Sequence, residues 1–324
     1  MLSNQYYFRI GTTAEKVLEL TKDLCETDTV LFLLSGGGSA LFEKPLIPGE
    51  ELQDITNQLL ASGADIVRIN TIRKRLSAVK GGKFAQWCVP ARIEAVVLSD
   101  ILGDPLDMIA SGPAAADSST CAEALAIAKE YGLNLSEQAM DCLKTETPKS
   151  LTNVHTQVIG SVRQLCAAAG EKCREWGYET VFLTDLLSCE AREAGAFLAA
   201  IARSHAGNGK KLAFLAGGET VVHLTGRGKG GRNQEIALGA VRGLEGLNAC
   251  VISVGSDGTD GPTDAAGGYA DGDTLVELAQ KGLDPAAVLR ENDAYHALKA
   301  VGNLIITGPT GTNVNDIAVV LVNG

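Results

Sequence analysis

The segments KLAFLAGGE (211–219), NQEIALGAVRGLEG (233–246) and ACVISVGSDG (249–258) decide the fold class of this 324-residue chain. The first and third runs are almost continuously apolar, which indicates strands buried on both faces. The run between them has the period of an amphipathic helix. Buried strands separated by helices are typical of a mostly parallel sheet.

The same alternation extends outward from this stretch to both ends of the chain. Further strand patterns occupy 29–38, 94–100, 154–161, 178–185, 303–308 and 316–323. Further helical patterns occupy 51–63, 121–133, 163–176, 190–206 and 273–281. The sequence therefore predicts an α/β fold with mostly parallel sheets.

A polar segment, KTETPKSLTNV (144–154), interrupts the alternation. It contains the helix-breaking Pro148 and has no apolar period, as expected of a linker. The chain length suits two domains better than one. We therefore predict an N-terminal α/β domain over 1–150 and a C-terminal α/β domain over 151–324.

Composition excludes several functional classes. A formal net charge of −11 makes nucleic acid a poor partner, because an acidic surface repels phosphate backbones. No apolar run reaches transmembrane length, and the first residues lack the apolar core of a signal peptide. The eight cysteines include no CxxC pair, so we expect reduced thiols and a cytoplasmic location without membrane contact.

Glycine-rich segments follow two of the predicted strands. Ligands bind at the carboxyl ends of strands in open parallel sheets, so these segments are candidate sites. SGGGS (35–39) can turn several backbone N–H groups toward one anion, and GRGKGGRN (226–233) adds cations at a helix start. The alternatives are an ordinary strand-to-helix turn and a floppy loop. Neither segment is a Walker A or a GxGxxG sequence.

The densest basic segment is NTIRKRLSAVKGGKFA (70–85), which contains Arg73 and Lys80. Lys80 precedes two glycines and could place its ammonium group near a phosphate. A solvated helix face is an equally good interpretation of this segment.

Acidic and amide side chains also follow predicted strand ends. They are Asp100, Asp104, Glu219, Asp257, Asp260, Asp264, Asn313, Asn315 and Asp316. Aspartates in such places can hold Mg²⁺ or act as a general base. The same residues also form ordinary Asx turns. There is no GxSxG or HExxH sequence, so nucleophilic hydrolysis is unsupported.

Several long motifs occur in an order that resembles the class II glycerate kinases. They are SGGGSAL (35–41), RKRLSAVKGG (73–82), LSDILGD (98–104), GGET (217–220), GRGKGGRNQE (226–235), SDGTDGPTDAAGG (256–268) and TGPTGTNVND (307–316). The resemblance extends from about residue 29 to the end of the chain. Its C-terminal part is similar to the MOFRL domain, over about 211–320.

The resemblance implies two Rossmann-like domains with the active site in the cleft between them. It implies phosphorylation of D-glycerate to 2-phosphoglycerate with ATP and Mg²⁺ as cofactors. An NAD(P)H-dependent hydroxypyruvate reductase and an inactive ligand-binding remnant are the alternatives. No dinucleotide fingerprint supports the reductase. Homodimer formation is left open.

We infer the expected roles from the chemistry of the residues within these motifs. The catalytic candidates are Lys80, Arg232, Asp257 and Asp260. The phosphate- or nucleotide-binding candidates are Ser35, Gly36, Gly37, Gly38, Ser39, Gly230, Gly231 and Asn233. The substrate-binding candidates are Arg73, Glu219 and Asn313. The metal-binding candidates are Asp100, Asp104 and Asp264.

The sequence departs from the family pattern at its start. Family chains begin further upstream, with a segment that contains a lysine thought to be catalytic, and residues 1–28 offer no such motif. Three alternatives follow. The first domain's sheet has an exposed edge, or another chain covers that edge, or the gene starts further upstream. An uncovered apolar edge would favour aggregation.

Overall fold

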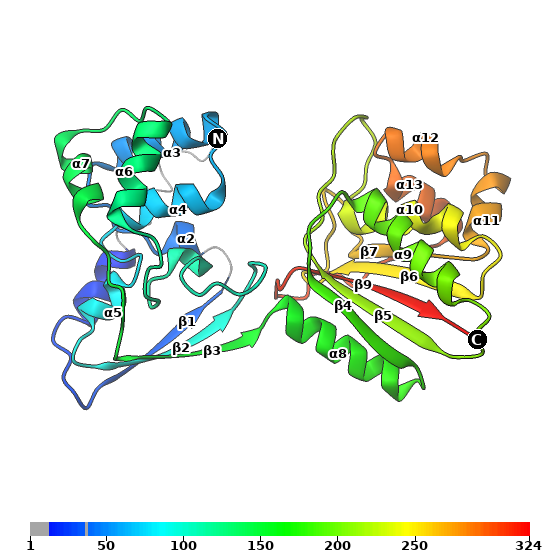
Figure 1. The fold of residues 1–324 in the computed structure, drawn as a ribbon, viewed down its shortest axis with the longest axis horizontal. Helices are drawn as coiled ribbons and strands as arrows, with labels where there is room; N and C mark the ends of the chain where they lie inside the picture. Colours follow the sequence, from blue (N-terminus) through cyan, green and yellow to red (C-terminus); the bar gives the residue numbers. More distant parts are fainter. Residues whose placement is uncertain (1–12, 36–37) are drawn as a thin grey trace. The chain divides into compact units, whose positions relative to one another are not determined.

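The computed structural model describes residues 13–35 and 38–324 and divides the chain into two compact units (Figure 1). The first unit covers residues 1–159 and the second covers 160–324. Each unit contains helices packed on a β-sheet, so the predicted α/β class is confirmed. Within the described residues, no helix is both long and apolar enough to cross a membrane.

The first unit contains a three-stranded sheet in the order β1 (Thr29–Leu34), β2 (Arg92–Leu98) and β3 (Val154–Gly160). β1 and β2 are parallel. The helices are α2 (Gly38–Leu41), α3 (Gly49–Ala61), α4 (Ile66–Arg75), α5 (Lys83–Trp87), the 3₁₀ turn η1 (Ile109–Ser111), α6 (Cys121–Glu130) and α7 (Glu137–Lys144).

Local sequence explains where these helices begin and which face they bury. Asp65 accepts a hydrogen bond from the Arg68 amide and so caps α4, and Thr120 and Glu123 form a capping box on α6. Apolar side chains at helical spacing on α3, α4, α6 and α7 form the largest cluster of this unit.

The polar segment 144–154 lies inside the first unit. Its Asn153 donates hydrogen bonds to the carbonyl oxygens of Ala85 and Ala91. The strand after it, β3, pairs with β2, although the sequence suggested that it opens a new series. The two units therefore divide at the end of β3, between Ile159 and Gly160.

β1 lies at one end of the strand order of this sheet. Leu31 and Leu33 point to the same face, because they are two residues apart in a strand. They are 65% and 68% exposed, respectively. The first unit thus carries an exposed apolar strand at the edge of its described sheet.

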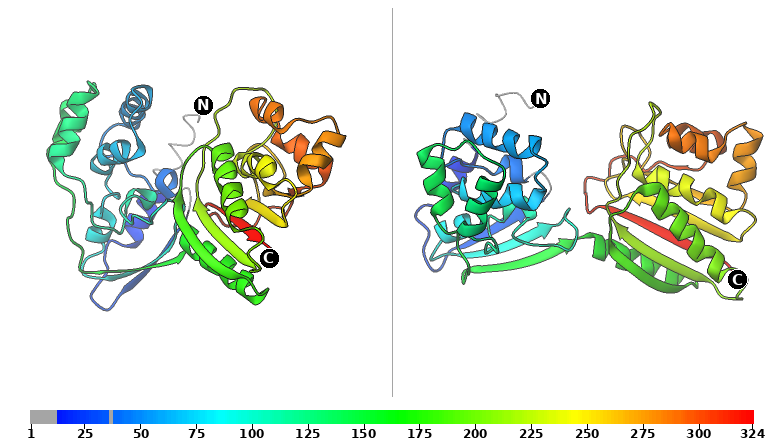
Figure 2. Two further views of the ribbon diagram at one scale, coloured as in Figure 1. Left: turned by 45° about the vertical axis from the view of Figure 1, so that its right-hand side comes forward. Right: turned by 45° about the horizontal axis from the view of Figure 1, so that its top comes forward.

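The second unit contains a six-stranded sheet in the order β4-β5-β9-β6-β7-β8. The strands are β4 (Glu179–Leu187), β5 (Leu212–Gly218), β6 (Ala249–Gly255), β7 (Gly267–Asp271), β8 (Leu304–Ile305) and β9 (Asp316–Val322). The helices are α8 (Val162–Glu175), α9 (Ala191–His205), α10 (Arg232–Leu244), α11 (Thr274–Gln280), α12 (Pro285–Arg290) and α13 (Ala294–Val301). α8 covers one face of the sheet, and α9 and α10 cover the other (Figures 1 and 2).

The direction of the strands in this sheet is more mixed than the sequence predicted. β4 and β5 are parallel, whereas β9 runs antiparallel to both β5 and β6. A strand buried on both faces has the same apolar pattern in either direction, so the sequence could not show that β9 inserts between β5 and β6. Because β9 opposes both neighbours, β5 and β6 end at the same edge of the sheet.

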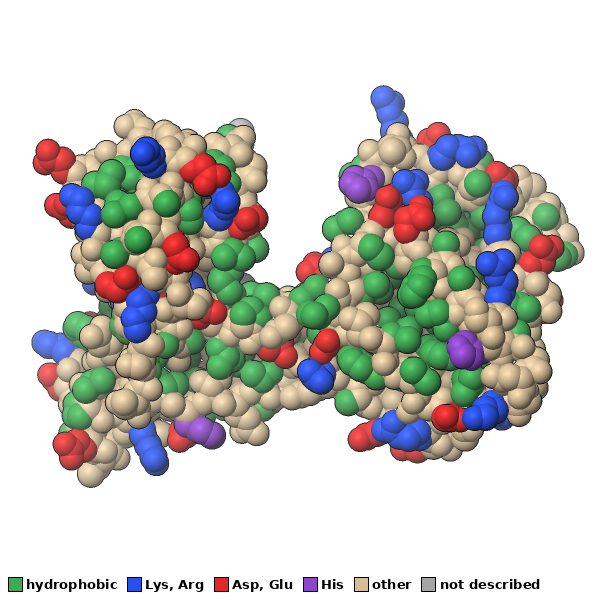
Figure 3. All heavy atoms as spheres, in the orientation of Figure 1, with side chains coloured by type: hydrophobic (Ala, Val, Ile, Leu, Met, Phe, Trp, Pro, Cys, Tyr) green, Lys and Arg blue, Asp and Glu red, His purple; other side chains and the backbone are tan. Residues whose placement is uncertain are grey.

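Charged side chains are dispersed over the face of the molecule shown in Figure 3. Acidic and basic groups alternate there, and no large basic patch gathers on that face. An anionic ligand on this face would therefore have to be bound by a local arrangement of cations and amides.

Candidate active site

The ends of three strands meet at Asp316. Gly218, the last residue of β5, and Gly255, the last residue of β6, both pair with Asp316 at the start of β9. The residues that follow β5 and β6, namely Glu219 and the loop with Asp257 and Asp260, therefore emerge beside one another. This edge is the place where open α/β sheets bind ligands.

Arg232, the first residue of α10, is held by two carboxylates at this edge. Its Nε and Nη2 donate to the two oxygens of Asp316, at 2.5 and 3.2 Å, and its Nη1 donates to Glu219 Oε1 at 2.7 Å. A planar guanidinium bound in this bidentate way has a fixed orientation. Burial disfavours its charge, but the bonds to Asp316 and Glu219 outweigh this effect and raise the pKa of Arg232. Arg232 therefore stays a cation.

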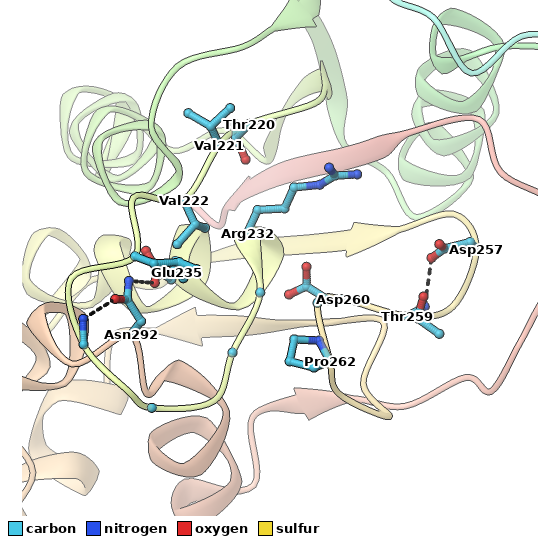
Figure 4. Close-up of a pocket in the computed structure, with 16 residues that line it drawn as sticks. Thr220, Val221, Val222, Arg232, Glu235, Asp257, Thr259, Asp260, Pro262 and Asn292 are labelled. Carbon is cyan, nitrogen blue, oxygen red and sulfur yellow. Dashed lines mark hydrogen bonds between the residues drawn. The ribbon is translucent and has the colours of Figure 1, made fainter. Parts of the chain in front are cut away.

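Arg232 borders a cavity of about 690 Å³ within the second unit (Figure 4). Gly230, Gly231, Asp257 and Asp260 also line this cavity, so the structure brings together five of the predicted site residues. The volume is within the range of small-molecule sites.

Asp260 is buried and occupies the N-terminal end of α10. Its carboxylate accepts from the backbone amides of Asn233 at 3.2 Å and Gln234 at 2.9 Å, and from Asn233 Nδ2 at 3.3 Å. Burial raises the pKa of Asp260 to about 6, although the two amide bonds oppose the shift. A phosphate was expected at this helix start, but the chain's own carboxylate already uses these two amides. The Asn233 side chain is likewise bound within the protein and not free for a phosphate, since its Oδ1 accepts from Ser253 Oγ at 2.6 Å.

Replacing Asp260 with alanine should destabilise the second unit by about 2 kcal/mol, because two helix-start amides lose their acceptor. The pKa of Asp260 is raised in the folded state, from 3.8 to about 6, so its contribution to stability is fully present below pH 3.8 and declines as pH rises through 6. The difference in unfolding free energy between wild type and Asp260→Ala should therefore shrink between pH 4 and pH 7. Urea titrations across this range measure it, and a difference independent of pH would contradict the assignment.

The glycine-rich loop before α10 is fastened to residues 291–293. The amides of Gly226, Gly228 and Lys229 donate to Asn292 Oδ1, the Glu291 carbonyl and Asp293 Oδ1, respectively, over 2.7–2.9 Å. A Cβ on Gly226 would lie 2.2 Å from Glu291 Cα, so only glycine permits this approach. The loop is thus an ordered wall of the cavity rather than a floppy connection.

Nearer to α10, the same loop offers unused donors. Within the described residues, the amides of Gly230 and Gly231 have no hydrogen-bond acceptor in the chain. A Cβ on Gly231 would lie 2.3 Å from the Asp260 carboxyl carbon, so glycine is required there too. Gly230 and Gly231 therefore offer two amides next to Arg232 that remain available to an anion.

Asp257 and Asp264 come from one loop but have different surroundings. Asp257 is half-buried, lines the cavity and accepts from the Thr259 amide at 2.9 Å. Asp264 is exposed and accepts from the Tyr295 hydroxyl at 2.7 Å, and this bond lowers the pKa of Asp264. Asn313 is exposed, and its Oδ1 accepts from the Asn315 amide at 3.1 Å.

The predicted metal-binding residues do not assemble into a site within one unit. Asp100 and Asp104 belong to the first unit, whereas Asp264 belongs to the second. Among residues 13–35 and 38–324, no group of three or more His, Cys, Asp and Glu side chains could hold a metal ion.

Lys80 in the first unit is fully buried. Its Nζ donates to the carbonyl oxygens of Ser39 at 2.7 Å, and of Phe42 and Ala110 at 3.4 Å, and lies 3.6 Å from Glu43. Burial lowers the pKa of Lys80 to about 8, and the charge of Glu43 opposes this shift. The ammonium group is therefore directed into the protein. The sequence had suggested either a contact with a phosphate or a position on a solvated helix face.

The other candidates of the first unit surround the same residues. Arg73 donates to the Ser39 carbonyl at 3.4 Å and pairs with Glu43 at 3.5 Å. The hydroxyl of Ser39 is 2.9 Å from that of Ser111. Ser35 is exposed and Gly38 begins α2, whereas Gly36 and Gly37 lie outside the described residues.

Two family models match the chain. A domain of unknown function, DUF4147, matches residues 11–144, and the MOFRL family matches residues 212–316. The D-glycerate 2-kinase of Thermotoga maritima is 52% identical over 96% of this chain and 76% of its own length. The glycerate 2-kinase of Pyrococcus horikoshii is 41% identical over 95% of this chain and 74% of its own length.

This chain belongs to the glycerate 2-kinase family. The crystal structure of the Thermotoga maritima glycerate kinase superposes with a TM-score of 0.93, at 51% identity, over 97% of this chain and 77% of that one. The expected family and the α/β fold are thereby confirmed.

Three residues of this glycerate 2-kinase family site escaped the sequence interpretation or had no definite role in it. Asp316 was considered only as one of several polar residues at strand ends, yet it holds Arg232. Glu235 and Asn292 line the cavity, and the sequence assigned no role to either of them. The position of Glu235, one helical turn after Arg232, was a usable signal, because residues three apart share a helix face. No local signal pointed to Asn292.

Proposed function

We propose that this chain transfers the terminal phosphoryl group of ATP to the 2-hydroxyl of D-glycerate. The observation that carries the proposal is the Arg232 guanidinium, fixed by Asp316 and Glu219 beside a cavity at the carboxyl edge of the sheet. Phosphoryl transfer depends on positioning and on neutralising charge on the transferred group, which an immobilised arginine does well. The relatives named D-glycerate 2-kinase and glycerate 2-kinase support the choice of substrate.

In the proposed reaction, Arg232 and the amides of Gly230 and Gly231 bind anionic oxygens of the two substrates. The Asp257 carboxylate accepts the proton of the 2-hydroxyl as the new O–P bond forms and the bond between the β- and γ-phosphates breaks. Asp260 holds the start of α10, and with it Arg232, in place.

Magnesium would accompany the nucleotide. Among the described residues, the carboxylates of the cavity do not form a site for it, because Asp260 and Glu235 are buried with partners in the chain and Asp257 is assigned to the hydroxyl proton. When bound, the ion would supply charge neutralisation on the phosphates.

A coupled assay separates this proposal from a hydroxypyruvate reductase. We expect ADP release from ATP and Mg²⁺ that depends on D-glycerate, and no oxidation of NADH or NADPH in the presence of hydroxypyruvate. Oxidation of either dinucleotide without ADP release would contradict the proposal.

A further inference from the structure

Glu235 is a buried carboxylate of the cavity that the proposed mechanism does not use. It lies on α10 one turn after Arg232, is 2% exposed and lines the same cavity. Its Oε1 accepts from Asn292 Nδ2 at 2.9 Å. Burial raises the pKa of Glu235, and the bond from Asn292 opposes this shift. A carboxylate in such surroundings is costly, so the contact with Asn292 needs an explanation.

Asn292 uses its whole amide group to connect three segments. Its Oδ1 accepts from the backbone amides of Thr225 at 2.7 Å and Gly226 at 2.9 Å. Its Nδ2 donates to the His223 carbonyl at 3.1 Å and to Glu235. Because only the oxygen can accept from two amides, the orientation of this side chain is determined. Asn292 itself is buried and has a φ of +54°, a strained backbone that its contacts maintain.

The two residues therefore join α10 to the start of the glycine-rich loop. Glu235 accepts from one end of the Asn292 amide group, and the other end binds the backbone at residues 225–226. Both residues line the cavity with Gly226, Gly228 and Arg232 (Figure 4). A shift of this contact would move the loop wall relative to Arg232.

We infer that Glu235 and Asn292 act as a positioning pair, which sets the distance between the glycine-rich loop and Arg232 and so determines the affinity of the cavity for its substrates. Neither residue needs to touch the reacting atoms. The expected change in KM rests on the proposed kinase function. The expected change in the position of the glycine-rich loop does not depend on that function.

Reversing the direction of the hydrogen bond tests the pair. Asn292→Asp places a second acceptor against the Glu235 carboxylate, so the contact should break. We expect the KM for ATP or D-glycerate to rise about tenfold or more, with a smaller change in kcat. Adding Glu235→Gln restores a donor–acceptor pair, so the double variant should recover most of the lost affinity. Glu235→Gln alone can still accept from Asn292, so it should raise KM by less than Asn292→Asp does.

Asn303→Asp provides a matched control. Asn303 is also buried, and its Nδ2 donates to Thr274 Oγ1 at 3.0 Å, but it does not line the cavity. This variant should lose stability without a change in either KM. An equal rise in KM for Asn303→Asp would overturn the inference, as would a double variant no better than Asn292→Asp.

Amide hydrogen exchange keeps the test independent of activity. The Thr225 and Gly226 amides should exchange faster in Asn292→Asp, because repulsion by Glu235 displaces the side chain that accepts from them, and return toward the wild-type rate in the double variant. Unchanged exchange would overturn the positioning role. Restored protection in a protein without kinase activity would instead refute only the proposed function.

Discussion

Replacing Arg232 with alanine is expected to lower kcat/KM for ATP and D-glycerate by about 10³-fold or more. The reason is that the guanidinium is the cation fixed at the carboxyl edge of the sheet, and arginines that neutralise a transferred phosphoryl group contribute about this much. Steady-state kinetics of the purified variant measure the effect. Turnover near that of wild type would refute the role of Arg232.

The same substitution should also affect folding. Asp316 is buried, and burial already raises its pKa while Arg232 opposes that shift. Removing the guanidinium leaves this carboxylate without its cation, which typically costs about 3–5 kcal/mol. Arg232→Ala should therefore cost stability as well as activity.

A double variant separates the two consequences. Arg232→Met with Asp316→Asn removes both charges, so urea denaturation should show most of the lost stability restored. Activity should remain lost, because no cation has been returned to the cavity. Recovery of turnover together with stability would show that Arg232 serves the fold alone.

Replacing Asp257 with asparagine is expected to lower kcat by about 10²- to 10⁴-fold, the usual contribution of a positioned general base. Its unfolding free energy should stay within about 0.5 kcal/mol of wild type, because the side chain is half-buried and asparagine can still accept from the Thr259 amide. Kinetics and urea denaturation on the same preparation check both statements.

Asp264→Asn is the matched control for Asp257. Both aspartates lie in the segment between β6 and β7, but Asp264 binds the Tyr295 hydroxyl and does not line the cavity. Its substitution should leave kcat unchanged. A comparable loss of kcat in both variants would argue that the loop as a whole, rather than the Asp257 carboxylate, supports the reaction.

The sequence could predict the parts of the site that follow strand ends. Asp257 and Glu219 were found because polar residues after buried runs must emerge at the edge of the sheet, and Arg232 and the glycines because a cationic glycine-rich loop at a helix start is typical of an anion site. Their grouping beside Asp316 could not be predicted, because it depends on β9 inserting between β5 and β6. An apolar run carries no information about the direction of a strand.

The direction in which a side chain points could not be predicted from the sequence either. Lys80 and Arg73 belong to a basic segment that could have faced solvent or a phosphate, yet Lys80 is fully buried against three carbonyl oxygens. A sequence motif shows that a cation is present but not what surrounds its charged end. Asn292 illustrates the converse, since its neighbours in sequence gave no sign that it binds α10 and the glycine-rich loop.

The position of the phosphate in the product tests the central claim most directly. Incubation of the purified chain with ATP, Mg²⁺ and D-glycerate, followed by proton-coupled ³¹P NMR, distinguishes a phosphate on carbon 2 from one on carbon 3 by its coupling to one or two protons. We predict a doublet from 2-phosphoglycerate that is absent from the Arg232→Met, Asp316→Asn variant. A triplet from 3-phosphoglycerate, or an unchanged doublet in that variant, would contradict the account.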